Sequence, residues 1–157
     1  MKVVSALVAA GALALAAVAP AAAAEIPAGG LTIREVAKWL QDAGYKAELK
    51  SGDRGSSYIR SAAEGTNFSI FLYDCKAERC ASLQFYAAFD KDKPMDLKVV
   101  NAWNRDSRFL KAYLDEEGDP VIEYDASVSP GGTYEALDDD FAVWTASLGK
   151  FKTHIGW

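Results

Sequence analysis

Apolar and polar residues alternate with two periodicities along this chain, one typical of helices and one typical of strands. From Leu31 to Gly44, apolar residues recur every three or four positions, which predicts a helix. Thr32 and Glu35 have the spacing of a capping box, in which each side chain bonds to the backbone amide of the other residue. The predicted apolar face consists of Ile33, Val36, Ala37, Leu40 and Ala43.

Two later stretches also have helical spacing. Pro94 is expected to open a second helix, because the first turn does not need the amide that proline lacks. Leu97, Val100, Asn101 and Asn104 would share one face of it, with Trp103 at the edge. A third, long amphipathic helix is predicted after Gly131-Gly132, with Thr133 as its cap. Its apolar stripe is Tyr134, Leu137, Phe141, Trp144, Leu148 and Phe151.

Between these predicted helices, apolar and polar residues alternate with the two-residue period of strands. Alternation over 45–50 predicts a half-buried strand, and 58–62 is a second, weaker one. Residues 110–114 and 121–126 are expected to pair around a turn at 115–119, in which Gly118 supplies the positive φ.

The clearest hairpin joins 68–75 to 80–89 around a loop at 76–79. If Cys75 faces Cys80, the numbers of paired residues sum to 155, which aligns apolar partners on one face. The apolar pairs are then Phe68 with Ala87, Ile70 with Phe85, and Leu72 with Leu83; the other face carries Phe71 with Gln84 and Tyr73 with Ser82. The element order is helix, four strands, helix, two strands, helix, which predicts an α+β domain with an antiparallel sheet.

The first 24 residues have the order of a secretory signal peptide. A lysine at position 2 precedes the uncharged run 3–18, and Ala22-Ala23-Ala24 offers a small-residue cleavage site before Glu25. An uncleaved anchor is the alternative. Cleavage after Ala24 would leave one domain, 25–157, in the periplasm or the medium, with no stable membrane insertion.

Composition narrows the classes of partner. Seventeen lysines and arginines against 22 aspartates and glutamates give a net charge of −5. A mixed acidic surface disfavours nucleic acid, whose phosphates require clustered basic residues.

The two cysteines have the spacing Cys-x4-Cys, and an exported chain with an even number of cysteines favours a structural disulfide between Cys75 and Cys80. Free thiols or a redox pair are the alternatives. With His154 as the only histidine, we expect neither a metal site nor a cofactor.

Familiar catalytic patterns are missing. A histidine-dependent catalytic site would have to use His154, which we expect to be a surface residue near the C-terminus. The acidic turn 115–119 lacks the spacing of an EF-hand and is better explained as a solvated turn. The acids 138–140 point in different directions on a helix, so we expect a solvated face that suits the helix dipole.

Two groups of residues are candidates for binding. Asn101, Asn104 and Trp103 either tie the second helix to neighbouring backbone or line a polar pocket for a small ligand. Phe71 and Tyr73, on the outer face of the hairpin, require cover from a helix or from a partner chain.

The stretch Asn101-Ala102-Trp103-Asn104, followed by Arg108-Phe109 and by Ala112-Tyr113-Leu114-Asp115 with Gly118, resembles the central signature of the YbjN-domain family. The hairpin 68–89 and the double glycine before the long helix also fit, so the resemblance runs from about Leu31 to the C-terminus. The family is labelled as sensory transduction regulators, and it defines no catalytic residues.

The resemblance implies a fold similar to that of type III secretion chaperones, which are small acidic proteins that bind other proteins and often dimerise. A signal peptide departs from this pattern, since such chaperones are not exported. We therefore expect a non-enzymatic module that binds a protein or peptide, with a homodimer possible. A small-ligand-binding sensor is the alternative, and a hydrolase of unrecognised type is the third hypothesis.

Overall fold

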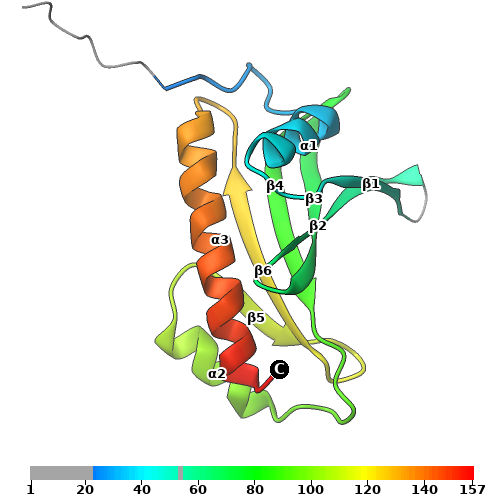
Figure 1. Ribbon diagram of the computed structural model, residues 1–157, viewed down its shortest axis with the longest axis vertical. Coiled ribbons are helices and arrows are strands. Elements are labelled where there is room, and N and C mark those ends of the chain that lie inside the picture. Colours follow the sequence, from blue (N-terminus) through cyan, green and yellow to red (C-terminus); the bar gives the residue numbers. More distant parts are fainter. Residues whose placement is uncertain (1–22, 53–54) are drawn as a thin grey trace, which may run out of the picture.

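A single antiparallel sheet organises the part of the chain that the computed structural model describes, residues 23–52 and 55–157 (Figure 1). The strands lie in the order β1-β2-β3-β4-β6-β5. The predicted α+β class and element order are confirmed. The elements are α1 (Ile33–Asp42), β1 (Glu48–Ser51), β2 (Ser57–Ala63), β3 (Thr66–Lys76), β4 (Arg79–Ala88), α2 (Leu97–Asp106), β5 (Lys111–Leu114), β6 (Pro120–Ser127) and α3 (Tyr134–Ile155).

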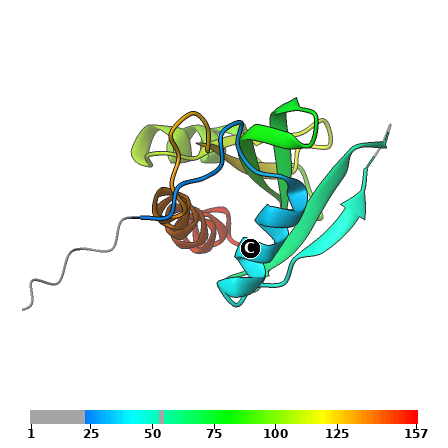
Figure 2. The same cartoon turned by 90° about the horizontal axis from the view of Figure 1, so that it is seen from above.

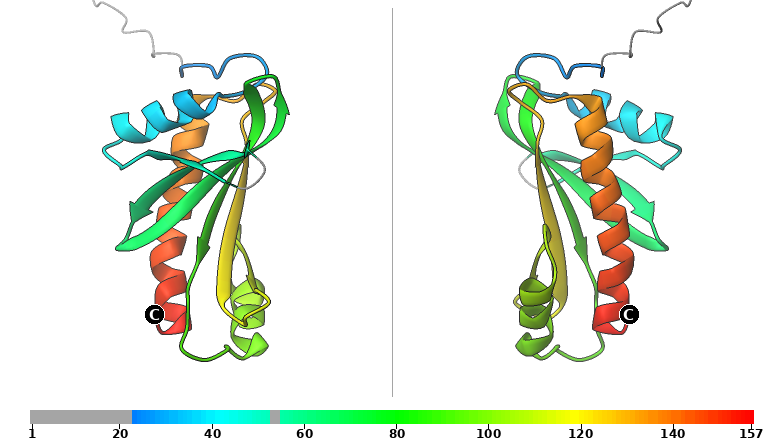
Figure 3. Two further views of the ribbon diagram at one scale, coloured as in Figure 1. Left: turned by 90° about the vertical axis from the view of Figure 1, so that its right-hand side faces the viewer. Right: turned by 90° about the vertical axis from the view of Figure 1, so that its left-hand side faces the viewer.

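The core fills the space between one face of the sheet and the helices α1 and α3, which lie on the same side (Figures 2 and 3). Trp144 of α3 is fully buried, and its ring centroid lies 5.7 Å from those of Phe68 and Phe85 on the sheet. Trp39 of α1 meets Phe141 of α3 edge to face at 5.2 Å. Burial of these large rings stabilises the fold. The apolar stripe predicted for α3 is confirmed.

The hairpin of β3 and β4 has the predicted register. Leu72 pairs with Leu83 and Ile70 with Phe85, and the numbers of the paired residues sum to 155. The loop is shorter than predicted, because the ladder continues to the pair Lys76–Arg79. Cys75 and Cys80 face each other across the two strands and are joined by a disulfide.

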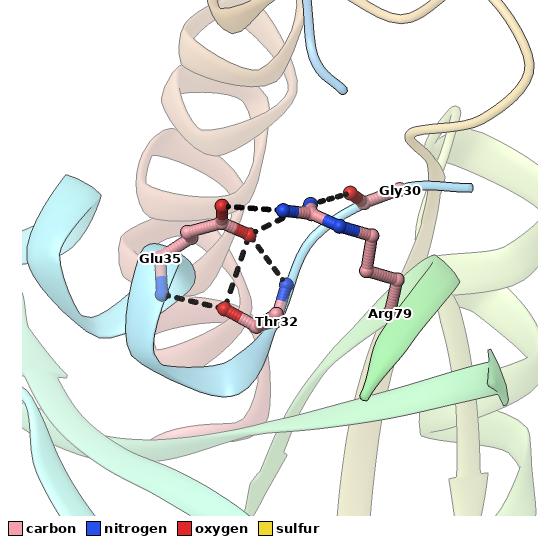
Figure 4. A network of polar contacts seen from close by, with 4 residues as sticks. All are labelled: Gly30, Thr32, Glu35 and Arg79. Atoms are coloured by element: carbon pink, nitrogen blue, oxygen red, sulfur yellow. Dashed lines mark hydrogen bonds and ion pairs between the residues drawn. The ribbon is translucent and has the colours of Figure 1, made fainter. Parts of the chain in front are cut away.

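The start of α1 is anchored to this hairpin through Arg79 (Figure 4). The predicted capping box is present: Glu35 N donates to Thr32 Oγ1 at 3.2 Å, and Thr32 N donates to Glu35 Oε2 at 2.8 Å. The Arg79 guanidinium donates to both carboxylate oxygens of Glu35 at 3.0 Å and to the carbonyl of Gly30 at 2.8 Å. The backbones of Leu31 and Cys80 also exchange two hydrogen bonds, so the cap, the disulfide and the hairpin form one unit.

The prediction for the first strand was wrong in detail. β1 begins at Glu48, and all four of its residues are exposed, so the alternation over 45–50 does not mark a half-buried strand. Tyr45 lies before the strand and packs its ring on Phe141 at 4.8 Å. β1 is an edge strand of the described sheet and pairs only with β2.

The second helix begins at Leu97 with Asp96 as its N-cap, three residues after Pro94. Leu97 is 65% exposed, whereas Val100 and Trp103 are buried. The helix lies beside β5 and the end of α3 (Figure 1), where Trp103 meets Phe151 at 5.0 Å. The buried stripe is therefore rotated away from the predicted face toward Trp103.

The acids 138–140 were predicted to form a solvated face; Asp138 and Asp139 are exposed, whereas Asp140 is half-buried, and two of the three also bond to neighbouring elements. Asp138 accepts a hydrogen bond from Nε1 of Trp39 at 2.7 Å, and Asp140 accepts one from the hydroxyl of Tyr124 at 2.5 Å. Burial, and then this bond to Asp140, raise the pKa of Tyr124. These carboxylates fix α3 to α1 and to β6.

Residues 1–22 of the predicted signal peptide lie outside the described residues. Directly after them, Tyr134 N donates to the carbonyl of Ala24 at 2.9 Å, and Glu25 forms a β-bridge with Thr133. Ile26 is 7% exposed and belongs to the core. Within the described residues, no helix is long and apolar enough to cross a membrane.

Candidate functional site

The face of the sheet opposite α1 and α3 is not covered by either helix, and α2 lies to one side, beside β5 (Figure 3). We call this surface the open face. Because side chains alternate across a strand, every second residue of β2 to β6 belongs to it. Its central members are Tyr58, Phe71, Tyr73, Gln84, Tyr86, Tyr113 and Glu123.

Aromatic rings form a row over three strands. The ring of Phe71 on β3 lies 5.4 Å from Tyr58 on β2 and 5.8 Å from Tyr86 on β4. Tyr73 extends the row along β3 and is 47% exposed. An aromatic row that is partly exposed on a flat sheet offers large apolar contact area together with hydroxyl groups.

Glu123 lies beside this row and is 7% exposed. Its carboxylate accepts hydrogen bonds from the hydroxyl of Tyr113 at 2.6 Å and from Nζ of Lys111 at 2.5 Å. The strand register places Tyr86 and Lys111 on either side of Glu123. Pairing with Lys111 allows this carboxylate to remain on a largely apolar surface, since an unpaired buried charge would be strongly destabilising.

Gln84 continues the polar network. Its Nε2 donates to Asp125 Oδ1 at 2.9 Å, and its Oε1 accepts from the hydroxyl of Tyr73 at 3.3 Å. The open face therefore combines aromatic rings with hydrogen-bonding groups that are fixed by their neighbours.

The pKa values of two tyrosines on this surface, Tyr86 and Tyr113, are raised. Burial, and then the nearby Asp115 and Glu123 carboxylates, raise the pKa of Tyr86. Burial and the hydrogen bond to Glu123 raise the pKa of Tyr113. The same carboxylate raises the pKa of Lys111, which stays charged. The surface thus has donors and acceptors for recognition, and the phenols of Tyr86 and Tyr113 are not activated as nucleophiles.

The residues predicted for binding lie in two separate places. Phe71 and Tyr73 are on the open face, whereas Asn101, Asn104 and Trp103 belong to α2. Asn101 is exposed and does not face inward, contrary to the prediction. Asn104 bonds through its side-chain amide to the backbone of Ala112, and Trp103 is buried against α3.

Sequence reasoning missed Glu123 and the tyrosines that surround it. The alternation of residues 121–126 could have predicted the outward placement of Glu123, because this residue lies between the inward residues Ile122 and Tyr124. The pairing of β4 with β6, which brings Tyr86 next to Glu123, could not be read from local spacing.

The lone histidine lies against α2. His154 donates from Nε2 to the carbonyl of Val99 at 2.8 Å, and its ring packs at 5.6 Å from Trp103. No group of three or more His, Cys, Asp or Glu side chains in the described ranges could hold a metal ion.

A model of the YbjN family, described as "putative bacterial sensory transduction regulator", matches residues 32–157. No curated protein matches the chain. The match covers the whole sheet and all three helices of the described structure, from the cap residue Thr32 onward. The chain therefore belongs to the YbjN family.

Proposed function

We propose that this chain is an exported, non-enzymatic regulatory module that binds another protein through the open face of its sheet. The observation that carries the proposal is the aromatic row Tyr58, Phe71 and Tyr86, extended by the exposed Tyr73, on a face that neither α1 nor α3 covers. Aromatic residues next to fixed polar groups are the composition typical of protein interfaces.

The edge of the sheet at β5 is less suited to binding a partner strand than the open face is to binding a partner surface. Ala112 on the edge strand β5 directs its N–H and carbonyl away from β6, and both groups are already bonded to Asn104. A partner strand would have to displace this amide before it could extend the sheet at that edge. Binding over the face requires no such displacement.

Two features support export. The order of residues 1–24 is that of a signal peptide, and the disulfide between Cys75 and Cys80 suits an oxidising compartment. The regulatory part of the proposal follows the description of the family.

A photo-reactive amino acid at position 73 tests the surface. The variant Tyr73→p-benzoylphenylalanine would be expressed with its leader and irradiated in intact cells. We expect a discrete adduct that is heavier than a dimer of the chain. The matched control is the same amino acid at Leu97, which is more exposed but lies on α2.

Three outcomes are informative. An adduct at position 73 that is missing at position 97 supports the proposal. Equal adducts at both positions, or no adduct except one between two copies of the chain, would contradict a specific partner at the open face. Mass spectrometry of the adduct identifies the partner.

The alternative, a small-ligand sensor, gains no support from Asn104, because the oxygen and the nitrogen of its side-chain amide both bond to the backbone of Ala112. Of the three predicted residues, Trp103 does line a cavity.

A further inference from the structure

A cavity of about 500 Å³ lies between the C-terminal end of α2, the connection to β5 and one side of α3. Trp103 and Val143 contribute apolar surface, while Ser147 and Lys150 contribute polar groups from α3. This cavity is distinct from the open face, and none of the contacts described above explains its composition.

The connection that borders the cavity has an unusual backbone. Phe109 has φ of +77°, and Leu110 N donates to the carbonyl of Arg108 at 3.0 Å across it. This geometry is that of a γ-turn with positive φ, which is rare and strained. Glycine would be the ordinary choice at such a φ.

The side chain of Phe109 does not compensate for this strain by packing in the core, because it is 60% exposed at the cavity. Strained residues of this kind concentrate at ligand-binding sites, where the surrounding structure holds a side chain in place for contact. The Arg108 guanidinium lies 4.6 Å from the ring centroid and is thereby held at the same border.

Charge at the cavity is unbalanced. Arg108 and Lys150 form no hydrogen bond or ion pair with any described residue. Asp106, the acidic residue of the lining, is engaged by Arg105 through two bonds of 2.7 and 2.6 Å. Two cations without a carboxylate partner thus border one cavity in a chain whose net charge is −5.

The indole of Trp103 forms part of the cavity wall. Trp103 is 5% exposed; its Nε1 is closed to solvent and, like that of Trp144, has no acceptor within the described residues. It also provides a local spectroscopic reporter.

We propose that this cavity binds a small organic anion with an apolar body. Arg108 and Lys150 would pair with its carboxylate or phosphate group, and Phe109 and Trp103 would contact its apolar part. Guanidinium and ammonium groups suit both kinds of anion. The inference goes beyond the proposed protein-binding function and does not depend on it.

Titrations of the mature protein with phenylacetate, phenyl phosphate and neutral phenylacetamide, followed by ¹H–¹⁵N NMR, test the proposal. We expect at least one anion to shift the indole resonance of Trp103 with saturation below about 10 mM, and phenylacetamide to have no such effect. The anion that binds more tightly distinguishes a carboxylate from a phosphate ligand. Saturation by the amide to the same extent, or no response to either anion, would overturn the proposal.

Three variants locate the binding. Lys150→Met should weaken anion binding at least tenfold, while Lys46→Met, which lies outside the cavity, should leave it unchanged. Phe109→Gly should also weaken binding while retaining or increasing the thermal stability, because glycine accepts this φ without strain. Unchanged binding in both Lys150→Met and Phe109→Gly would overturn the assignment to this cavity.

Discussion

Asn104 on α2 forms two hydrogen bonds with the backbone of Ala112, on the outer side of the edge strand β5. Its Nδ2 donates to the carbonyl of Ala112 at 2.8 Å, and Ala112 N donates to its Oδ1 at 2.9 Å. The side-chain amide of Asn104 therefore makes the two backbone hydrogen bonds that a neighbouring strand would otherwise make with Ala112. Native proteins protect exposed strand edges because unpaired backbone groups there recruit other chains.

Removal of this amide is predicted to destabilise the protein and to open the edge. Asn104→Ala leaves the N–H and carbonyl of Ala112, a residue that is 4% exposed, without their partner. We expect the free energy of unfolding to fall by about 1–3 kcal/mol. Urea denaturation followed by circular dichroism measures this.

Asn101→Ala is the matched control, since Asn101 lies on the same helix and is equally exposed, but its side chain forms no hydrogen bond with a described residue. Its effect should stay within about 0.5 kcal/mol. Equal effects of the two alanines would show that the bonds to Ala112 contribute nothing particular.

The lowered pKa of Glu35 predicts that the stability of the protein depends on pH. Its hydrogen bond from the Thr32 backbone, followed by the contacts with Arg79, lowers the pKa of this carboxyl in the folded protein below the ordinary value of 4.5. A lowered folded pKa means that the contribution is complete above pH 4.5 and is lost as the pH falls through the folded value. Wild type should therefore lose more stability than Glu35→Gln between pH 7 and pH 3.

The expected difference is at most about 1 kcal/mol, because the Glu35–Arg79 pair is partly exposed and screened. Thermal denaturation at both pH values measures it. Glu78→Gln, next to Arg79 in the sequence but not paired with it, is the control. An identical pH response in wild type and Glu35→Gln would exclude a role for this carboxylate.

The disulfide is predicted to contribute modestly. A bridge between residues five apart closes a short ring, so the chain-entropy gain is at most about 2 kcal/mol. The same end of the hairpin is also held by the Arg79 network and by the backbone bonds between Leu31 and Cys80. Cys75→Ser should therefore fold, with a lower urea midpoint.

The double variant Cys75→Ser/Cys80→Ser should match the single variant within error. Two titratable thiols in wild-type protein purified from the periplasm would contradict the bridge itself. A Cys75→Ser variant that cannot fold would mean that the Arg79 network does not hold the hairpin on its own.

The hairpin and α1 could be predicted from sequence because their determinants are local. The pairing Ile70–Phe85 and the cap at Thr32 both depend on residues that are close along the chain, and each is supported by two independent patterns. The prediction of the buried face of α2 was wrong because that face is determined by residues distant along the chain. Leu97 and Trp103 compete for the buried side, and the position of α2 beside β5 and Phe151 decides between them.

Predictions for the candidate site show the same limit. The outward placement of Phe71 and Tyr73 followed from alternation within one hairpin, and the structure has it. The environment of Glu123 requires β6 to insert between β4 and β5, which no local pattern encodes. The cavity at Trp103 likewise arises only where α2 meets α3.

Export predicts a defined N-terminus. Cleavage after Ala24 should yield a mature chain that begins at Glu25, and intact-mass spectrometry of periplasmic protein measures this. Cleavage there would leave the core residue Ile26 and its N–H bond to Gly132 at 2.9 Å in place, and would remove the bond from Tyr134 N to the carbonyl of Ala24. Ala24→Asp should block processing, since the site requires a small neutral residue. A mature species that retains residues 1–24 would refute the soluble exported form.

The open face also predicts self-association. An uncovered aromatic surface of this kind is unusual on a monomer, so we expect a reversible homodimer at micromolar concentration in which the second copy occupies the face until a partner displaces it. Light scattering should give close to twice the mass of the chain.

Tyr73→Glu should shift this equilibrium to the monomer, because it places a charge within the aromatic row next to Phe71 and the acidic Asp125 network. Leu97→Glu is the control: it adds the same charge at a more exposed apolar residue outside the open face and should leave the dimer intact. A wild-type chain that remains monomeric at high concentration would show that α1, α3 and the sheet complete the core alone. In that case the whole aromatic row, from Tyr58 to Tyr86, is free for a different protein.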